Sequence, residues 1–273
     1  MRPLALDSSA VAVLAQPAGD CAPQLRVIEA WARERDLELL DLGTTDAPRA
    51  LDGGCAFVVA LGGDGTILRA LQLAMLSHSP VLGVNFGHVG FLADIEGREL
   101  TAALDRIGRG EAQVDDRTAL VATTQTDERR HMVAFNDVVI SRLAGHGTAR
   151  LHVEVSGEPV LDVTGDGLVV ASPTGSTAYN VEAGGPAVAP ALDAIVLTPL
   201  AAQGSPLRSM VLDGGDTIRI ETAPRSAPLV VEVDGRTAHD VPTPATVEIR
   251  TAPGKARLVR TRPRTFYGDL ARR

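Results

Sequence analysis

The pattern of hydrophobic residues changes once along this chain, at about Asp115, and that change limits the fold more than any other feature. Before it, short apolar segments alternate with stretches of helical spacing. The apolar segments predict strands at residues 11–15, 37–42, 56–61 and 81–84; the stretches between or after them predict helices at 23–35, 67–76 and 99–107. This alternation predicts an open parallel sheet wrapped by helices, a Rossmann-like α/β domain.

After Asp115 the helical spacing largely disappears, and turn residues such as Ser156-Gly157, Asp213-Gly214-Gly215 and Asp234-Gly235 separate short apolar or alternating segments. These segments predict strands at 118–123, 132–140, 149–155, 167–171, 194–198, 217–221, 229–233 and 246–250, with one helix near 176–183. The pattern is typical of an antiparallel β-sandwich. We therefore expect an α/β domain over residues 1–115, a β-sandwich over 116–255, and a tail, 256–273, that returns to the first domain.

The charge of the chain excludes several classes of partner. The formal net charge is −8, which is a poor match to nucleic acid or to an anionic membrane, so neither is expected as a partner. The apolar segment 11–15 is too short to span a bilayer, and no signal-peptide pattern precedes it, which favours the cytoplasm. Cys21 and Cys55 are expected to be reduced thiols, and the six histidines lack metal-ligand spacing, so no metal site built by the protein is predicted.

A glycine-rich loop follows the third predicted strand and opens a helix, with the sequence Leu61-Gly62-Gly63-Asp64-Gly65-Thr66. Glycines let backbone N–H groups approach a ligand closely, and the start of a helix attracts anions, so the loop is predicted to bind phosphate. A phosphate would repel the carboxylate of Asp64. Either a divalent cation offsets that repulsion, or Asp64 faces a hydroxyl group and acts as a base. The alternative is a tight turn in which Asp64 caps the helix.

A second glycine cluster, residues 83–92, follows the fourth predicted strand and contains Asn85, His88 and Phe91. Neighbouring parallel strands end at the same edge of a sheet, so both glycine loops are expected to meet on one ligand. Alternatively, the second loop only turns the chain. For His88 we favour a structural role.

Small polar residues gather in the second half of the chain, in Gly165-Asp166-Gly167, in residues 172–180 and in Gly184-Gly185-Pro186. Hydroxyl, amide and glycine residues at this density suit a polar ligand such as a nucleotide, although a surface loop with helix caps would also explain them. Asn136-Asp137 interrupts an apolar segment. Buried polar groups need partners, which a ligand can supply.

Taken together and in this order, from about residue 56 to Asp234-Gly235, these motifs resemble the NAD kinase family. Diacylglycerol and sphingosine kinases share the glycine–aspartate loop alone. The resemblance implies transfer of a phosphoryl group from ATP or polyphosphate to the 2′-hydroxyl of the adenosine ribose of NAD, which gives NADP, with Mg²⁺ or Mn²⁺ accompanying the donor. It implies a nucleotide-binding first domain and a substrate-binding second domain. It also implies a homo-oligomer, a dimer or a tetramer, in which a neighbouring subunit helps to complete the NAD site.

The resemblance assigns roles to individual residues by their place in the motifs. Asp64 matches the general base, and Gly62, Gly63, Gly65, Thr66 and Asn85 belong to the phosphate- or nucleotide-binding loops. Phe91 matches a residue near the adenine, and Asn136 and Asp137 match a pair that engages the adenosine. Asp166 matches an acid on the nicotinamide side. The remaining residues expected at the dinucleotide site are Thr174, Thr177, Ala178, Tyr179 and Glu182.

The chain departs from the family pattern at Glu182, at residues 202–205, at Ser209 and at Arg236. Glu182 either accepts a hydrogen bond from the adenine amine or faces solvent. Two other functions therefore stay open: a related kinase that acts on another hydroxyl, of a nucleoside or a lipid, and a non-catalytic NAD(P)-binding sensor. The hydroxyl-rich segment 172–180 argues against a lipid, and the presence of Asp64 argues against a sensor.

Overall fold

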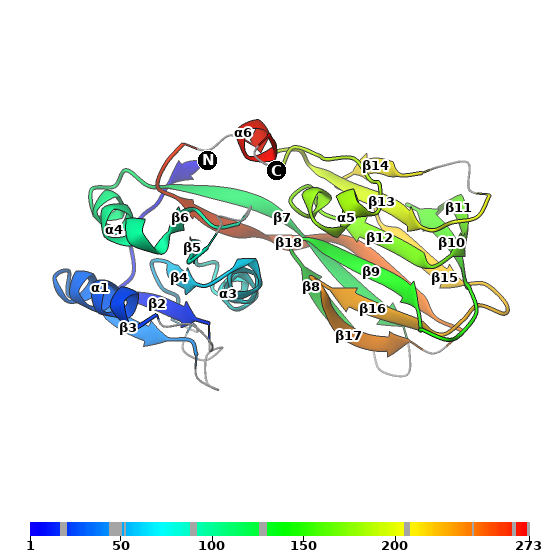
Figure 1. Cartoon of the computed structure of the whole chain (residues 1–273), viewed down its shortest axis with the longest axis horizontal. Helices are drawn as coiled ribbons and strands as arrows, with labels where there is room; N and C mark the ends of the chain where they lie inside the picture. Colours follow the sequence, from blue (N-terminus) through cyan, green and yellow to red (C-terminus); the bar gives the residue numbers. More distant parts are fainter. Residues whose placement is uncertain are drawn as a thin grey trace. The chain divides into compact units, whose positions relative to one another are not determined.

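The computed structural model describes residues 1–16, 21–43, 51, 53–87, 92–125, 130–204, 208–241, 243–263 and 266–271. The chain forms two compact units, the first made of residues 1–116 and 255–273 and the second of residues 117–254. It passes from the first unit to the second within strand β7 (Gln113–Gln125) and returns within strand β18 (Thr246–Arg260), both labelled in Figure 1.

The first unit is built on parallel strands in the order β3-β2-β4-β5, as predicted for the α/β half. The returning part of β18 adds a further parallel pairing, of Leu258 with Val81. Its strands are β1 (Arg2–Pro3), β2 (Ala10–Ala15), β3 (Glu38–Asp41), β4 (Val58–Leu61), β5 (Val81–Asn85) and β6 (Ile95–Glu96). Its helices are α1 (Ala22–Arg33), α3 (Asp64–Leu76), η1 (Gly97–Glu99), α4 (Leu100–Gly108) and α6 (Phe266–Leu270).

Helices cover the central strands, which are apolar, whereas β3 begins and ends with exposed charged residues. All four residues of β4 are buried, as expected for a strand that is covered on both faces. Helices α1 and α4 contact each other and share a core cluster with Val11, Val13 and Phe57. Helix α3 packs against β4 and β5, and its first residue, Asp64, lies within the glycine-rich loop.

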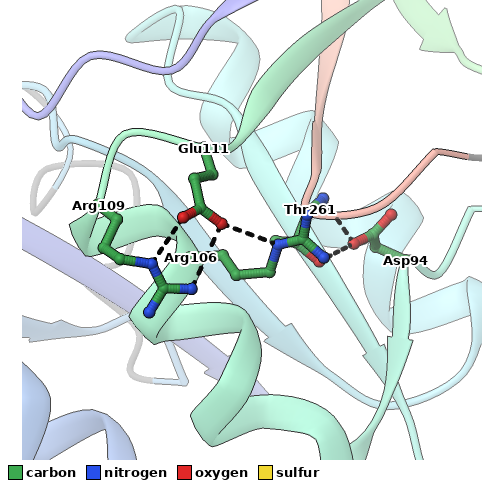
Figure 2. A network of polar contacts seen from close by, with 5 residues as sticks. All are labelled: Asp94, Arg106, Arg109, Glu111 and Thr261. Atoms are coloured by element: carbon green, nitrogen blue, oxygen red, sulfur yellow. Dashed lines mark hydrogen bonds and ion pairs between the residues drawn. The ribbon is translucent and has the colours of Figure 1, made fainter.

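A buried carboxylate fastens the returning tail to the first unit. Asp94 is fully buried, and its Oδ2 accepts hydrogen bonds from the Thr261 backbone N–H at 2.9 Å and from Thr261 Oγ1 at 2.6 Å, as Figure 2 shows. The neighbouring Arg260 guanidinium lies 3.6 Å from Asp94 Oδ1 and 3.5 Å from Asp115 Oδ2. Since a buried charge is stable only with partners, this cluster sets the position of the end of β18.

The second unit is a sandwich of two antiparallel layers, which confirms the predicted fold. One layer is a sheet in the order β14-β13-β12-β9-β16-β17, and the other contains the pairings β11-β10-β15-β18 and β7-β8. Side chains of both layers, among them Ile140 and Val170 from the first and Val153 and Ile220 from the second, share one core. The elements are β8 (Arg130–Ala134), β9 (Asp137–Arg142), β10 (Ala149–Val155), β11 (Glu158–Gly165), β12 (Gly167–Ala171), η2 (Gly175–Thr177), α5 (Tyr179–Glu182), β13 (Ala194–Leu200), β14 (Met210–Asp213), β15 (Ile218–Thr222), β16 (Leu229–Val233) and β17 (Arg236–Val241).

Some elements differ from the predictions. The predicted strand 132–140 is two strands, β8 and β9, separated at Phe135-Asn136, where backbone groups bond to side chains instead of to a ladder. The predicted helix 176–183 is a 3-10 turn, η2, followed by the single turn α5. Strands β11, β14 and β17 were not predicted. Each lies at the end of a sheet path, where a partly exposed strand has a weaker hydrophobic signal.

The sequence predicts reduced thiols at Cys21 and Cys55 and an apolar segment, 11–15, too short to span a bilayer. Cys21 and Cys55 are buried, and neither is in a disulfide. No helix in the described part of the chain combines the length and the hydrophobicity that crossing a bilayer requires.

Replacing Asp94 with alanine should lower the free energy of unfolding of the first unit by about 3 kcal/mol, because buried Arg260 and Thr261 lose this carboxylate. Chemical denaturation followed by the fluorescence of Trp31, the single tryptophan, reports on this unit. Glu111→Ala is the control, since Glu111 pairs with Arg106 and Arg109 at the surface and should leave the midpoint nearly unchanged. Equal effects of the two substitutions would contradict the anchoring role of Asp94.

Candidate functional site

The glycine-rich loop of the first unit lies at the carboxyl end of the parallel strands. Gly62 follows β4, and its N–H donates to the Val84 carbonyl of β5 at 2.9 Å. A Cβ atom on Gly62 would lie 2.4 Å from Thr66 Oγ1 and 3.1 Å from Gln16 Oε1. Only glycine fits this position without moving its neighbours, so the loop backbone lies directly against the first turn of α3.

Asp64 is the first residue of helix α3, with Gly63 as the N-cap. Its side chain is half-buried, Gly65 is exposed and Thr66 is half-buried. The N–H groups of Thr66 and Ile67 donate to the Gly63 carbonyl at 2.9 and 3.2 Å, which closes the first turn. The positive end of the helix dipole favours negative charge here, both on a bound phosphate and on the carboxylate of Asp64.

Asn85 ends β5 beside the glycine loop, because Leu61 of β4 pairs with Val84 of β5. Its Oδ1 accepts a hydrogen bond from the Gly87 N–H at 3.3 Å. The first unit thus brings Asn85 and the residues of the glycine loop to one edge of the sheet. Phe91 and His88 lie outside the described residues.

Three neighbouring strands of the second unit bring most of the other predicted residues to one end of a sheet. Ala171, the last residue of β12, pairs with Asp137, the first residue of β9. Val233, the last residue of β16, pairs with Val138 of β9. Residues 135–137, the segment that starts at Ser172 and the turn that starts at Asp234 therefore lie together.

Hydrogen bonds to side chains hold residues 135–137 from two sides. Asp234 Oδ1 accepts from the N–H groups of Phe135, Asn136 and Asp137 at 3.0, 2.7 and 3.3 Å. Ser172 Oγ donates to the Phe135 carbonyl at 2.6 Å, and the Ser172 N–H donates to the Asn136 carbonyl at 2.8 Å. A Cβ on Gly175 would lie only 1.9 Å from the Asn136 oxygen. The segment after β12 consequently lies in direct backbone contact with Asn136.

The carboxyl group of Asp137 is buried and lies near a second carboxylate. Asp137 as a whole is only 3% exposed. Burial and the negative charges of Asp234 and Glu232 raise the pKa of Asp137 to about 7, although a hydrogen bond from the Tyr179 N–H opposes the shift. Burial also raises the pKa of Asp234, against the effect of the three N–H groups and of Arg236. Asp137 therefore binds the start of α5 within the protein, whatever ligand it also contacts.

The segment 174–182 contains both buried and exposed predicted residues. Thr174 and Thr177 are buried, and Thr177 Oγ1 donates to the Thr174 carbonyl at 3.3 Å. Ala178 is half-buried, Tyr179 is 48% exposed and Glu182 is exposed. The exposure of Glu182 places its carboxylate at the surface of this segment.

Asn180 holds this segment together from the inside. It is fully buried; its Nδ2 donates to the carbonyls of Ser176 and Pro186 at 2.9 and 3.1 Å, and its Oδ1 accepts from Thr198 Oγ1 at 2.7 Å. Val188 and Ala183 continue the packing against the outer face of the sheet. The segment is thus a packed part of the fold and not only a surface loop.

Asp166 is not brought to this end of the sheet. It precedes β12, whereas the segment 172–180 follows it, so Asp166 and Ser172 lie about 20 Å apart along the strand. The Asp166 carboxylate pairs with Arg142 Nε at 2.6 Å and is about half exposed. Within a single copy of the protein, Asp166 is therefore remote from Asn136 and Thr174.

Sequence reasoning did not assign roles to three residues that shape this site, Asp234, Ser172 and Asn180. Asp234-Gly235 shows only the pattern of a turn, and no local signal places it beside Asn136. Ser172 and Asn180 lie within the polar segment, but the sequence does not separate residues that face a ligand from residues that bond inside the protein. Among the described residues, no three His, Cys, Asp or Glu side chains gather as a metal-binding group.

Comparisons with known proteins agree with this order of motifs. The family model of the ATP-NAD kinase N-terminal domain matches residues 23–112, and that of the ATP-NAD kinase C-terminal domain matches residues 135–261. The NAD kinase of Moorella thermoacetica (strain ATCC 39073 / JCM 9320) is 38% identical over 211 residues, which are 77% of this chain and 68% of that protein.

Solved structures share the fold at lower identity. Yeast NADH kinase complexed with NADH has a TM-score of 0.82 at 21% identity, covering 100% of this chain and 86% of that one. An NAD kinase from Archaeoglobus fulgidus in complex with ATP has a TM-score of 0.75 at 22% identity, covering 96% and 98%.

The raised pKa of Asp137 predicts a specific dependence of stability on pH. Between pH 4 and pH 7 the folded protein keeps a proton that the unfolded chain has lost, so the free energy of unfolding falls as the pH rises. Asp137→Asn cannot titrate and should lose about 2 kcal/mol less than the unmodified protein between pH 5 and pH 8. Denaturant unfolding at each pH measures the difference. Asp213→Asn, in an exposed turn of the same unit, should keep the original slope; an unchanged slope in Asp137→Asn would refute the assignment.

Proposed function

This chain belongs to the NAD kinase family, and we propose on that basis that it transfers a phosphoryl group from ATP to the 2′-hydroxyl of the adenosine ribose of NAD, which gives NADP. Both family models match, in the order of the two units of the fold. The relatives named NAD kinase and the structural relatives with NADH and with ATP support the same two substrates.

The observation that carries the proposal is the position of Asp64. Its carboxylate begins α3 within the glycine-rich loop, at the edge where parallel strands end. A ribose hydroxyl is a weak nucleophile until a positioned base accepts its proton, and Asp64 is that base in this proposal. The loop N–H groups and the helix dipole stabilise the phosphate charge, since phosphoryl transfer depends mainly on positioning and charge neutralisation.

The second unit supplies the recognition of the dinucleotide. Asn136 and Tyr179, with the partly exposed Ala178, lie at the end of the sheet where polar groups converge. Amide, hydroxyl and backbone groups of this kind suit the hydroxyls and the base of an adenosine. Thr174 and Thr177 are both buried, so they lie beneath this surface and support it.

A divalent cation, Mg²⁺ or Mn²⁺, fits the residues that are present. The cation would be held mainly by the phosphates of the donor and by water, beside the glycine-rich loop in which Asp64 begins α3, so that the carboxylate of Asp64 can still act as the base. When bound, the cation neutralises charge on the transferred phosphoryl group. The protein's own contribution is the loop geometry and the acceptor carboxylate. Polyphosphate remains an alternative donor, because it offers the loop the same phosphate groups.

A second subunit would explain the position of Asp166. Asp166 is remote from Asn136 and Thr174 within one chain, yet its place in the motif corresponds to a contact on the nicotinamide side. We propose a homo-oligomer in which Asp166 reaches the NAD site of a neighbouring copy. Arg142, which pairs with Asp166, orients the carboxylate for that contact.

One assay separates this function from its alternatives. The protein is incubated with ATP and Mg²⁺ and, in separate reactions, with NAD, NADH, free nucleosides, diacylglycerol and sphingosine. Phosphorylation of NAD or NADH alone supports the proposal. A nucleoside or lipid product would instead favour a related kinase, and binding without any product would favour a sensor.

Asp64→Asn should keep the fold and the binding of NAD but lower kcat by roughly 10²–10⁴-fold, the usual effect of removing a general base. Steady-state kinetics with NAD and ATP measures this, with circular dichroism as the check on folding. The matched control is Asp105→Asn, an exposed aspartate on α4 of the same unit, which should retain full activity. A folded Asp64→Asn protein with nearly normal kcat would exclude the base assignment.

If a neighbouring copy supplies Asp166, Asp64→Asn and Asp166→Ala should each lower activity, and co-expressing them should restore part of it. Asp64→Asn and Asp166→Ala are co-expressed with different tags, and the hybrid is purified. It contains sites with Asp64 from one chain and Asp166 from the other, and should regain up to half of the activity per site of the unmodified protein. Light scattering establishes the number of subunits. An inactive hybrid, or a fully active monomer, would contradict the shared site.

A further inference from the structure

One carboxylate of the second unit accepts the N–H groups of three consecutive residues. Besides the bonds to Oδ1 described above, Asp234 Oδ2 accepts from the Phe135 N–H at 3.1 Å. The Asp234 N–H donates in return to the Asp137 carbonyl at 3.0 Å. Hydrogen bonds to an ionised acceptor are roughly twice as strong as neutral ones. The β16–β17 turn is therefore joined to residues 135–137 in both directions.

We propose that Asp234 is a positioning residue for NAD, because its carboxylate holds residues 135–137 in the conformation in which Asn136 and Asp137 face the dinucleotide. The inference rests on the proposed function, since NAD is the ligand that these two residues would engage. Asp234 acts through the backbone of the turn and not by contact with NAD.

The interruption between β8 and β9 creates the need for such an acceptor. Backbone N–H groups at a break in a strand have lost their ladder partners, and leaving them unpaired in a partly buried place is costly. Ser172 binds the carbonyl groups of Phe135 and Asn136, whereas Asp234 binds the N–H groups. The two residues divide the polar groups of the turn between them. Removing Asp234 leaves the carbonyl side held and the N–H side free to move.

The hairpin alone does not require a carboxylate at position 234. Asp234 has φ of +50° and precedes Gly235, and the β10–β11 hairpin of the same unit has Ser156 at φ of +50° before Gly157. Serine, asparagine or glycine thus satisfies the turn. A carboxylate here also lies near the acidic group of Asp137, an unfavourable arrangement, whereas the charge of Arg236 acts in the opposite direction. The hydrogen bonds to residues 135–137 explain why a carboxylate stands at this position, whereas the hairpin turn does not.

The test compares Asp234→Gly, which removes the acceptor but accepts the backbone angle, with Asp234→Asn, which keeps one acceptor oxygen. Asp234→Gly should raise KM for NAD roughly ten- to hundredfold, the equivalent of losing a charged hydrogen bond. KM for ATP and kcat should change by less than about threefold. Asp234→Asn should recover most of the KM for NAD. The matched control is Ser156→Gly, which also places glycine in the first position of an equivalent turn. Its kinetics should be unchanged.

Amide hydrogen exchange gives a readout that does not depend on activity. Exchange at residues 135–137 should be faster in Asp234→Gly, close to normal in Asp234→Asn, and normal in Ser156→Gly. If Asp234→Gly does not fold, Asp234→Ser replaces it, because the β10–β11 hairpin shows that serine tolerates this turn.

An unchanged KM for NAD in the folded glycine or serine variant, or unchanged exchange at residues 135–137, would overturn the inference. If the unmodified protein does not phosphorylate NAD, the proposed function fails and positioning for NAD fails with it. The exchange experiment then still shows whether Asp234 holds the turn.

Discussion

Both candidate sites depend on a glycine at which the chain lies too close to its neighbours for a side chain to fit. At Gly62 the loop backbone lies against the side chain of Thr66, in the first turn of α3, and at Gly175 the backbone lies against the Asn136 carbonyl. Each close approach fixes a short polar segment against a strand end. Rigid elements at strand ends are suitable supports for binding groups, since their geometry varies little. The same physical requirement thus positions the glycine-rich loop in one unit and the polar segment 172–180 in the other.

An acidic protein must also stabilise carboxylates that it buries. Asp94, Asp137 and Asp234 are each held mainly by N–H or hydroxyl groups: Asp94 by Thr261, Asp137 by Tyr179 and Asp234 by residues 135–137. Only Asp94 has an arginine, Arg260, buried beside it. Backbone donors hold a carboxylate without the flexibility of a long basic side chain. As a result, these acidic groups determine where segments distant in sequence meet.

The distribution of exposed and buried polar residues bears on specificity. In the segment 172–182, Ser172, Ser176 and Asn180 are fully buried and bond within the protein, whereas Tyr179 and Glu182 are exposed. Surface residues can differ from the family pattern without disturbing the fold, and Glu182 is such a residue. Because Glu182 is exposed, its side chain can contact a ligand or a partner subunit but does not contact the core. Under the proposed function, differences of this kind alter substrate preference more readily than phosphoryl transfer, which the proposal assigns to the loop around Asp64.

The sequence by itself determined the two kinds of architecture, because hydrophobic periodicity differs between covered parallel strands and half-exposed antiparallel ones. It also determined the position of Asp64, since a glycine loop between a strand and a helix is a local pattern. The strand β14, at one end of a sheet path, escaped prediction because its apolar residues are not fully buried and give a weak hydrophobic signal. Only the tertiary structure separated Asp166 from Asn136: Asp166 precedes β12, and it is the opposite end of β12, at Ala171, that pairs with Asp137. Likewise, only the tertiary structure brought Asp234 to Asn136, across 98 residues, because strand order and not sequence distance decides which turns meet.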